Sequence, residues 1–249
     1  MVGKILIIIG VLILILIAVA FFSIKSVQNT PPPKLVANFV NLDKIEKISK
    51  YRSCQGHVVV PQSGLESRRN MKHYFDVKKE FIGNDTVEIY APYEGYISAI
   101  SSDPGKGLEG EIWISPVQII GMLPPIGMWN FSVEHINVKQ GLKVGDKVRA
   151  GDLLGYAALT DYPDSFDIVY GKLSIPPKNI DGWTSPFSDL DSVFNHMSDE
   201  AFDPYQKKGI TSKESLIMSK EARDQNPCKY SEGIFLNGMD HPEDLIILP

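Results

Sequence analysis

The stretch "SVEHINVKQGLKVGDKVRAGDLLGYA", Ser132–Ala157, decides the fold of this chain. It opens with a strand-like run that carries one histidine, His135, and continues with glycines that punctuate short polar segments. Gly145, Gly151 and Gly155 stand where tight turns between short strands need a positive φ or a close backbone approach. The stretch therefore predicts a series of short strands joined by tight turns.

The sequence on both sides of this stretch is also typical of strands. Runs rich in β-branched and aromatic residues cover 86–101, 110–123, 128–138, 147–159 and 165–175, with Gly and Pro between them. No long helical period interrupts them. We therefore expect a mainly β domain, a sandwich or rolled sheet, over residues 45–180. After Pro186 the spacing of apolar residues becomes helical, and 181–249 is predicted to be an extension with one or two short helices.

The N-terminus predicts a membrane anchor. Residues 5–24 read "ILIIIGVLILILIAVAFFSI" and contain no charge, which is enough apolar helix to cross a bilayer. We assign 1–25 to a single transmembrane helix and 26–44, with three consecutive prolines, to a stiff linker. A cleaved signal peptide with a small-x-small site at Ala18–Ala20 is the alternative. With the anchor retained, the protein is a single-pass protein of the cell membrane and most of the chain is extracytoplasmic.

The charge and the cysteine content of the chain indicate which partners and which cross-link to expect. The net charge is −5 and no basic run is present, so nucleic acid is not expected as a partner. Cys54 and Cys228 are the two cysteines of the chain. Outside the cytoplasm such a pair predicts one disulfide, which would join the start of the domain to its tail.

Three motifs carry a resemblance to a known family. They are "YAPYEGYISAI" at 90–100, "FSVEHINV" at 131–138 and the glycine pattern that ends at Gly155. In this order they resemble the duplicated-hybrid-motif fold of the lysostaphin-like zinc endopeptidases, which cut peptidoglycan cross-bridges. The resemblance covers about half of the chain. It implies a zinc ion held by a His-x-x-x-Asp segment and a His-x-His strand, with a further histidine that assists proton transfer.

This chain departs from that pattern at both ligand segments. Upstream, "RRNMKHYFDVK" offers His73 and Asp76, which are one residue too close together. The strand that should carry His-x-His reads "SFDIV" and places Ser165 and Asp167 at those positions. His135 matches the catalytic histidine of the middle strand. The remaining metal set is His73, Asp76 and Asp167, for zinc or another divalent ion, and such an oxygen-rich set suits harder ions than zinc.

The resemblance therefore implies a peptidase-like domain that has lost its activity and binds a cell-envelope glycan, peptide or partner protein. One alternative is an active metallo-endopeptidase with an atypical His/Asp/Asp site. Another is a barrel-sandwich membrane adaptor or a structural component of an envelope complex. Under the first reading, four basic residues near the cleft could hold an anionic ligand. They are Arg52, Arg68, Arg69 and Lys72.

Overall fold

The computed structural model describes residues 30–249 apart from 84, 104–107, 119–125 and 160–163. Residues 32–249 form one compact unit. The predicted anchor at 1–25 lies outside the described residues, as does the candidate cleavage site. In the part of the chain that is described, no helix is long and apolar enough to cross a membrane.

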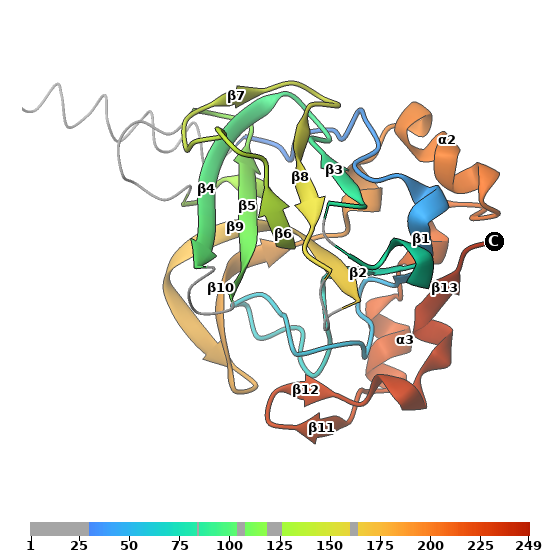
Figure 1. Ribbon diagram of the computed structural model, residues 1–249. Helices are drawn as coiled ribbons and strands as arrows, with labels where there is room; N and C mark the ends of the chain where they lie inside the picture. Colours follow the sequence, from blue (N-terminus) through green and yellow to red (C-terminus); the bar gives the residue numbers. More distant parts are fainter. Residues whose placement is uncertain (1–29, 84, 104–107, 119–125, 160–163) are drawn as a thin grey trace, which may run out of the picture. The chain divides into compact units, whose positions relative to one another are not determined.

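The described chain is mainly β, as the sequence predicts, and an antiparallel sheet dominates it (Figure 1). The strands are β1 (Ile45–Ser49), β2 (His73–Val77), β3 (Glu88–Tyr90), β4 (Gly95–Asp103), β5 (Leu108–Ser115), β6 (Trp129–Val138), β7 (Lys147–Val148), β8 (Leu153–Ala157), β9 (Ser165–Ile180), β10 (Trp183–Leu190), β11 (Tyr230–Glu232), β12 (Phe235–Leu236) and β13 (Leu245–Ile247). Neighbours in the main sheet follow the order β13-β1-β2-β9-β6-β5-β4-β7, with β10 on β9 and β8 bridging β3 and β6. β11 and β12 form a separate hairpin.

Alternation along β9 explains how the sheet separates a core from a cleft. Successive side chains of a strand point to opposite faces of the sheet. Phe166, Ile168 and Tyr170 therefore face the main core and are almost fully buried. Val169 faces the other side, where it packs in a smaller apolar cluster with residues of the 51–60 segment and β10. Asp167 also faces this second side of the sheet.

The C-terminal part contains two short helices, α2 (Asp199–Lys207) and α3 (Lys220–Gln225), as the sequence predicts for 181–249. The helical spacing predicted directly after Pro186 is wrong in position, because the chain there is still strand β10, which pairs with β9 as far as Leu190. Ser198 and Ser219 cap them by accepting hydrogen bonds from backbone N–H groups of the first turn. Phe202 and Tyr205 of α2 belong to the main core. In Figure 1 both helices lie on the side of the molecule where β1 and β13 form the end of the sheet.

The glycines that predicted tight turns occupy the backbone positions expected of them. Gly145 and Gly151 have φ values of 94° and 87°. Gly155 allows a close approach, because a Cβ atom there would lie 2.2 Å from the carbonyl oxygen of Asn137. Side chains at these positions would strain the turns or separate β8 from β6.

The predicted disulfide is confirmed. Cys54 and Cys228 are bonded, with their Cα atoms 5.3 Å apart and 174 residues between them in sequence. Next to the bond, Arg223 is fully buried, donates to Cys54 Sγ and forms an ion pair with the buried carboxylate of Asp244. The bond and the ion pair together hold α3 and the chain terminus against the start of the domain.

We predict that replacing both cysteines by alanine lowers the free energy of unfolding by about 2–5 kcal/mol, because the closed loop is long. Urea titration followed by circular dichroism measures the change. The reduced wild-type protein should match the double variant. A difference between wild type and double variant within experimental error would contradict this role of the bond.

Candidate functional site

A cleft of about 440 Å³ lies over the second face of the sheet. Its walls come from the 55–57 segment and from β2, β6, β9, β12 and β13, so distant parts of the sequence build it. The lining residues are Gln55, Gly56, His57, Tyr74, Asp76, Glu134, His135, Ser165, Asp167, Phe235 and Leu245. Three carboxylates and two histidines are among them.

Strand register aligns polar side chains in one row across four neighbouring strands. Glu111 of β5 lies opposite Glu134 of β6, Glu134 lies opposite Asp167 of β9, and Asp167 lies opposite Tyr74 of β2. Residues directly opposite on antiparallel strands share a face. The next row pairs Asp76 with Ser165. The pairing of β2, β6 and β9 therefore builds the floor of the cleft.

A β-bulge adds His135 to this floor. Gly110 pairs with Ile136 while Glu111 pairs with Glu134, so His135 is an extra residue on β6. Its φ is 62°, a left-handed conformation that is uncommon outside glycine. The bulge lets two successive side chains, Glu134 and His135, face the cleft while Ile136 returns to the core. Strained backbone of this kind is typical of functional sites.

The ammonium group of Lys72 lies between two carboxylates of the cleft. Its side chain is 3% exposed, it donates to Glu134 Oε2, and its Nζ is 3.5 Å from Asp167 Oδ1. Burial alone would lower the pKa of Lys72, but the charges of Asp167 and Glu134 outweigh burial and raise it. The lysine is therefore protonated at neutral pH and supplies a fixed positive charge among these carboxylates.

Both cleft histidines are neutral at pH 7. Burial, with the charges of Lys72 and His57 added, lowers the pKa of His135 to about 4. Its Nε2 lies 3.7 Å from Asp167 Oδ2. Burial also lowers the pKa of His57, whose Nδ1 is 3.0 Å from the carbonyl oxygen of Val58. A carbonyl only accepts, so Nδ1 of His57 carries the proton and Nε2 is an acceptor.

Asp167 is the most deeply buried carboxylate of the cleft. Burial and the nearby charge of Glu134 raise its pKa well above the usual range of aspartate. Its Oδ1 is buried, and in the described chain no donor reaches it with hydrogen-bond geometry, since Lys72 stands at 3.5 Å. A buried carboxylate oxygen that accepts no hydrogen bond lowers the free energy of unfolding.

His73 does not join this cleft, and the predicted set of His73, Asp76 and Asp167 is wrong in this respect. Its side chain points to the opposite face of β2, where it is 1% exposed and packs edge-on against Phe194. Nδ1 lies 2.8 Å from Ser49 O and Nε2 lies 2.8 Å from Ser192 Oγ, so both ring nitrogens are occupied. Burial lowers the pKa of His73 to about 4. A spacing of three residues places His73 and Asp76 on opposite faces of a strand.

The structure brings the other three predicted residues, Asp76, His135 and Asp167, to the cleft wall. Asp76 is half-buried, and burial raises its pKa to about 6. In the residues that the structure describes, no hydrogen bond or ion pair engages its carboxylate, although Lys47 is near enough to lower its pKa and Asp164 to raise it. Asp76 is therefore a carboxylate whose ionisation the fold disfavours.

Three of the four residues of the expected basic rim are engaged by carboxylates. Arg69 is almost fully buried, and its guanidinium is 2.6 Å from Glu66 and 2.5 Å from Asp224. Arg52 contacts the same Glu66 at 2.9 Å. Lys72 belongs to the cleft floor, as described above. Three of the four positive charges that the sequence placed near the cleft thus have carboxylate partners, whereas Arg68 is exposed and its backbone N–H donates to Asp181.

Sequence reasoning missed the cleft roles of Lys72, Tyr74 and Glu134. Alternation along the strand could have predicted that Lys72 and Tyr74 share a face with Asp76, because both lie an even number of residues before it. Lys72 stands four residues before Asp76, at the spacing of the His-x-x-x-Asp segment. Glu134 was hidden because strict alternation places it opposite His135, and the bulge that overrides alternation depends on pairing with β5.

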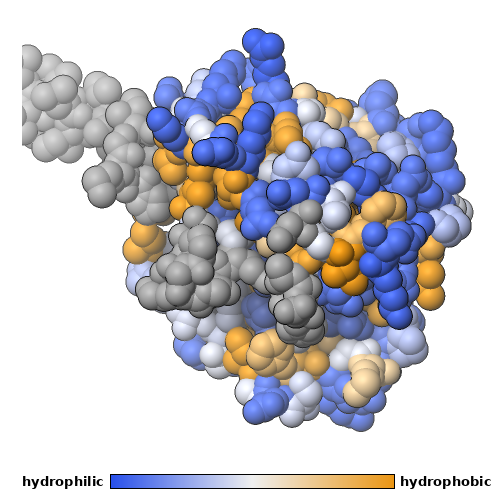
Figure 2. All heavy atoms as spheres, in the orientation of Figure 1, coloured by the Kyte–Doolittle hydropathy of each residue, from blue (hydrophilic) through white to orange (hydrophobic). Residues whose placement is uncertain are grey.

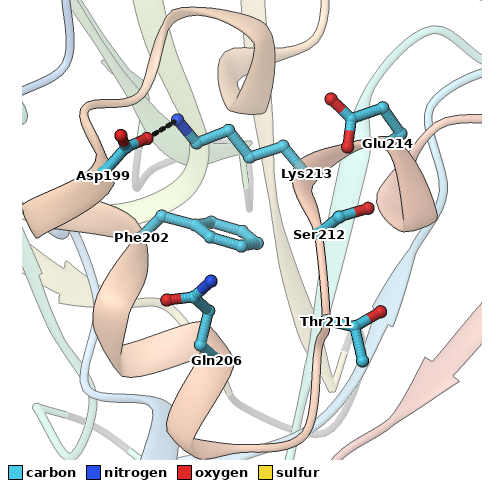
Figure 3. Close-up of a pocket in the computed structure, with 7 residues that line it drawn as sticks. All are labelled: Asp199, Phe202, Gln206, Thr211, Ser212, Lys213 and Glu214. Carbon is cyan, nitrogen blue, oxygen red and sulfur yellow. Dashed lines mark hydrogen bonds and ion pairs between the residues drawn. The ribbon is translucent and has the colours of Figure 1, made fainter.

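A second depression, of about 260 Å³, lies between α2 and the 211–214 segment (Figure 3). Lys213 there donates to Asp199 at 2.7 Å and to the carbonyl of Met197 at 2.7 Å, and its ammonium lies above the Phe202 ring. Figure 2 shows that hydrophilic residues surround the hydrophobic groups on the visible face. Lys213 and Asp199 of this depression are already paired with each other, and the depression is smaller than the cleft over the sheet, which is the better candidate.

We predict that Lys72→Ala lowers the free energy of unfolding by about 3–5 kcal/mol, because it leaves Glu134 and Asp167 without their buried counter-charge. Chemical denaturation at pH 7 measures the loss. Lys207→Ala, which removes an exposed ion pair with Asp203, is the matched control and should change stability by less than about 1 kcal/mol. Equal effects of the two substitutions would contradict the buried role of Lys72.

We predict that Asp76→Asn stabilises the protein at pH 7. The pKa of Asp76 is raised in the folded state, so folding takes up a proton between about pH 4 and 6, and the wild type loses stability as the pH rises through that window. The groups that face Asp76 are Lys47, Glu46 and Asp164. Melting curves from pH 4 to 8 should show the variant gaining over wild type above pH 5. A variant that is less stable than wild type at pH 7 would contradict this sign.

Comparisons with known proteins agree with the predicted resemblance. No family model and no curated protein matches the sequence. Solved structures that match include Csd3 of Helicobacter pylori, at 15% identity over 87% of this chain and 47% of that chain, with a TM-score of 0.36. Lysostaphin matches at 21% identity over 51% of this chain and 49% of that one, with a TM-score of 0.32. The M23 metalloprotease pseudoalterin matches at 16% identity over 65% of this chain and 88% of that one, with a TM-score of 0.35.

Lysostaphin and an M23 metalloprotease are thus among the solved structures that match this chain, at low identity and low TM-score. The chain spans about half the length of the Csd3 and lysostaphin structures that it matches. At these TM-scores the matches carry no argument about the residues of this chain, and the roles of individual residues are argued from the cleft itself.

Proposed function

We propose that this chain is a peptidase-like domain without peptidase turnover, which binds a cell-envelope peptide or glycan in the cleft over its sheet. The observation that carries the proposal is the buried ammonium of Lys72 between Glu134 and Asp167. A single-pass anchor at residues 1–25 would hold the domain at the outer surface of the membrane.

The cleft residues do not fit a catalytic zinc. Glu134, His135 and Asp167 have one ligand atom each within 4.8 Å of one another, which is a possible metal set by distance. Lys72 already neutralises two of these three groups, and a divalent cation beside its ammonium would be repelled. The atypical His/Asp/Asp set of an active enzyme requires His73, whose two ring nitrogens are engaged on the other face of the sheet.

Two further groups of the site, His135 and Lys72, are also poorly suited to proton transfer in a hydrolytic step. A general base works best with a pKa near the operating pH. The pKa of His135 is about 4, and Lys72 is held protonated. Binding needs none of this chemistry, because a concave site with fixed charges and an apolar wall is sufficient.

We expect no stoichiometric zinc and no cleavage of peptidoglycan by the full chain purified in detergent. Elemental analysis after dialysis against zinc, combined with release of amines from cell-wall fragments, measures both. Cleavage that is lost on His135→Ala would contradict the proposal. Sedimentation of the protein with intact cell-wall fragments should show binding without release.

A gain of metal binding tests the role of Lys72 directly. In Lys72→Ala the ligand set of Glu134, His135 and Asp167 loses its internal cation, so zinc should raise the melting temperature of the variant. The wild type at the same zinc concentration should show no shift. A zinc-induced shift of equal size in wild type would show that the ammonium does not exclude the metal.

A further inference from the structure

We propose that the cleft binds an alkyl-ammonium group carried by an envelope peptide, with Asp76 as its counter-ion. This inference rests on the proposed binding function and names the chemical class of its ligand. The group would be a lysine-like side chain or another primary amine on a peptide. Three features of the cleft support it: its charge, its unmatched acceptors and its apolar wall.

The charge of the cleft favours a cation. Asp76, Glu134 and Asp167 line it, while its histidines are neutral. Lys72 is buried beneath the cleft, and its partners are Glu134 and Asp167. Lys47 lies opposite Asp76 on β1 and lowers its pKa, but in the described chain no ion pair joins the two side chains. A cleft lined by one sign of charge attracts ligands of the opposite sign.

One oxygen of Asp167 and the carboxylate of Asp76 have no hydrogen-bond donor among the described residues. Asp167 is almost fully buried, yet within the described chain no donor meets its Oδ1 with hydrogen-bond geometry. The Asp76 carboxylate has no hydrogen bond or ion pair among the described residues, and its ionised form is disfavoured by burial. Groups that a fold leaves unmatched at the cost of stability mark functional sites. A ligand with N–H donors would satisfy the carboxylate of Asp76, which has no ion pair with Lys72.

The other acceptors of the cleft match the donors of an ammonium group. Ser165 pairs with Asp76 across β9 and β2, so its hydroxyl lies on the same wall. His57 contributes Nε2 as an acceptor, since its Nδ1 donates to Val58. A primary ammonium has three donors and no acceptor. The polar end of the cleft thus offers more acceptors than donors.

The cleft also has apolar lining that suits an alkyl stem. It is supplied by Phe235 of the β11–β12 hairpin and by Leu245 at the start of β13. Phe235 is 54% exposed and packs edge-on against the ring of His57. A lysine-like side chain buries its methylene stem on apolar surface and keeps its charged end with polar partners. The volume of about 440 Å³ can hold such a side chain with part of its backbone.

Binding is tested by titrating the full chain with the peptide acetyl-Gly-Lys-Gly-amide and with the same peptide acetylated on the lysine amine. Chemical-shift changes in NMR spectra measure the dissociation constants at low ionic strength. The amine peptide should bind about tenfold more tightly than the acetylated peptide, because a charge-assisted hydrogen bond is lost on acetylation. Asp76→Asn should abolish that preference without unfolding the protein.

Asp203→Asn is the matched control, because Asp203 is an exposed carboxylate on α2 that pairs with Lys207. It should keep the preference for the amine peptide. Equal binding of the two peptides by wild type, or an unchanged preference in Asp76→Asn, would overturn the ammonium assignment. Displacement of the peptide by zinc at equimolar concentration would overturn it in favour of a metal site.

These outcomes are distinguishable from failure of the proposed function. Cleavage of cell-wall peptides by wild type would remove the proposed function and leave the peptide preference as a specificity of an enzyme. Binding of cell-wall fragments without cleavage, combined with no preference for the amine, would leave the proposed function intact and overturn the ammonium inference alone.

Discussion

The buried ammonium of Lys72 is the interaction on which the account of this molecule depends. It lies where the side chains of β6 and β9 converge, and it contacts Glu134 and Asp167. Without it, two adjacent carboxylates would share a half-closed cleft with no counter-charge, at a cost of several kcal/mol. With it, the polar row that crosses the sheet is tolerated, and a fixed amine stands where a bound cation would otherwise be needed.

The bulge at His135 gives this interaction its surroundings. Because His135 is an extra residue on β6, Glu134 and His135 both face the cleft, and the rest of the strand keeps its apolar side chains in the core. The disulfide and the buried pair of Arg223 with Asp244 lie next to the cleft, since Cys54 precedes Gln55 and Asp244 precedes Leu245, and they hold the C-terminal segment that supplies Phe235 and Leu245. The cleft is thus assembled from a rigid floor and a wall that is tied in place covalently.

Much of the fold could be predicted from sequence, because glycines at turns and alternation along strands are local signals. The positions of Gly145, Gly151 and Gly155, the mainly β architecture and the cysteine pair are confirmed. The site could be predicted only in part. His73 was predicted to lie in the cleft because a histidine at this position suits a metal ligand. Its spacing of three residues from Asp76 already implied that the two side chains lie on opposite faces of the strand. The bulge at His135 depends on pairing with a distant strand, and no pattern within "SVEHINV" encodes it.

Crystals of the full chain soaked in zinc, with diffraction recorded at the zinc absorption edge, test the central claim most directly. The account predicts density for the Lys72 ammonium between Glu134 and Asp167 and no anomalous peak within coordination distance of Glu134, His135 and Asp167. An anomalous peak bound by those three side chains, with Lys72 displaced, would contradict it.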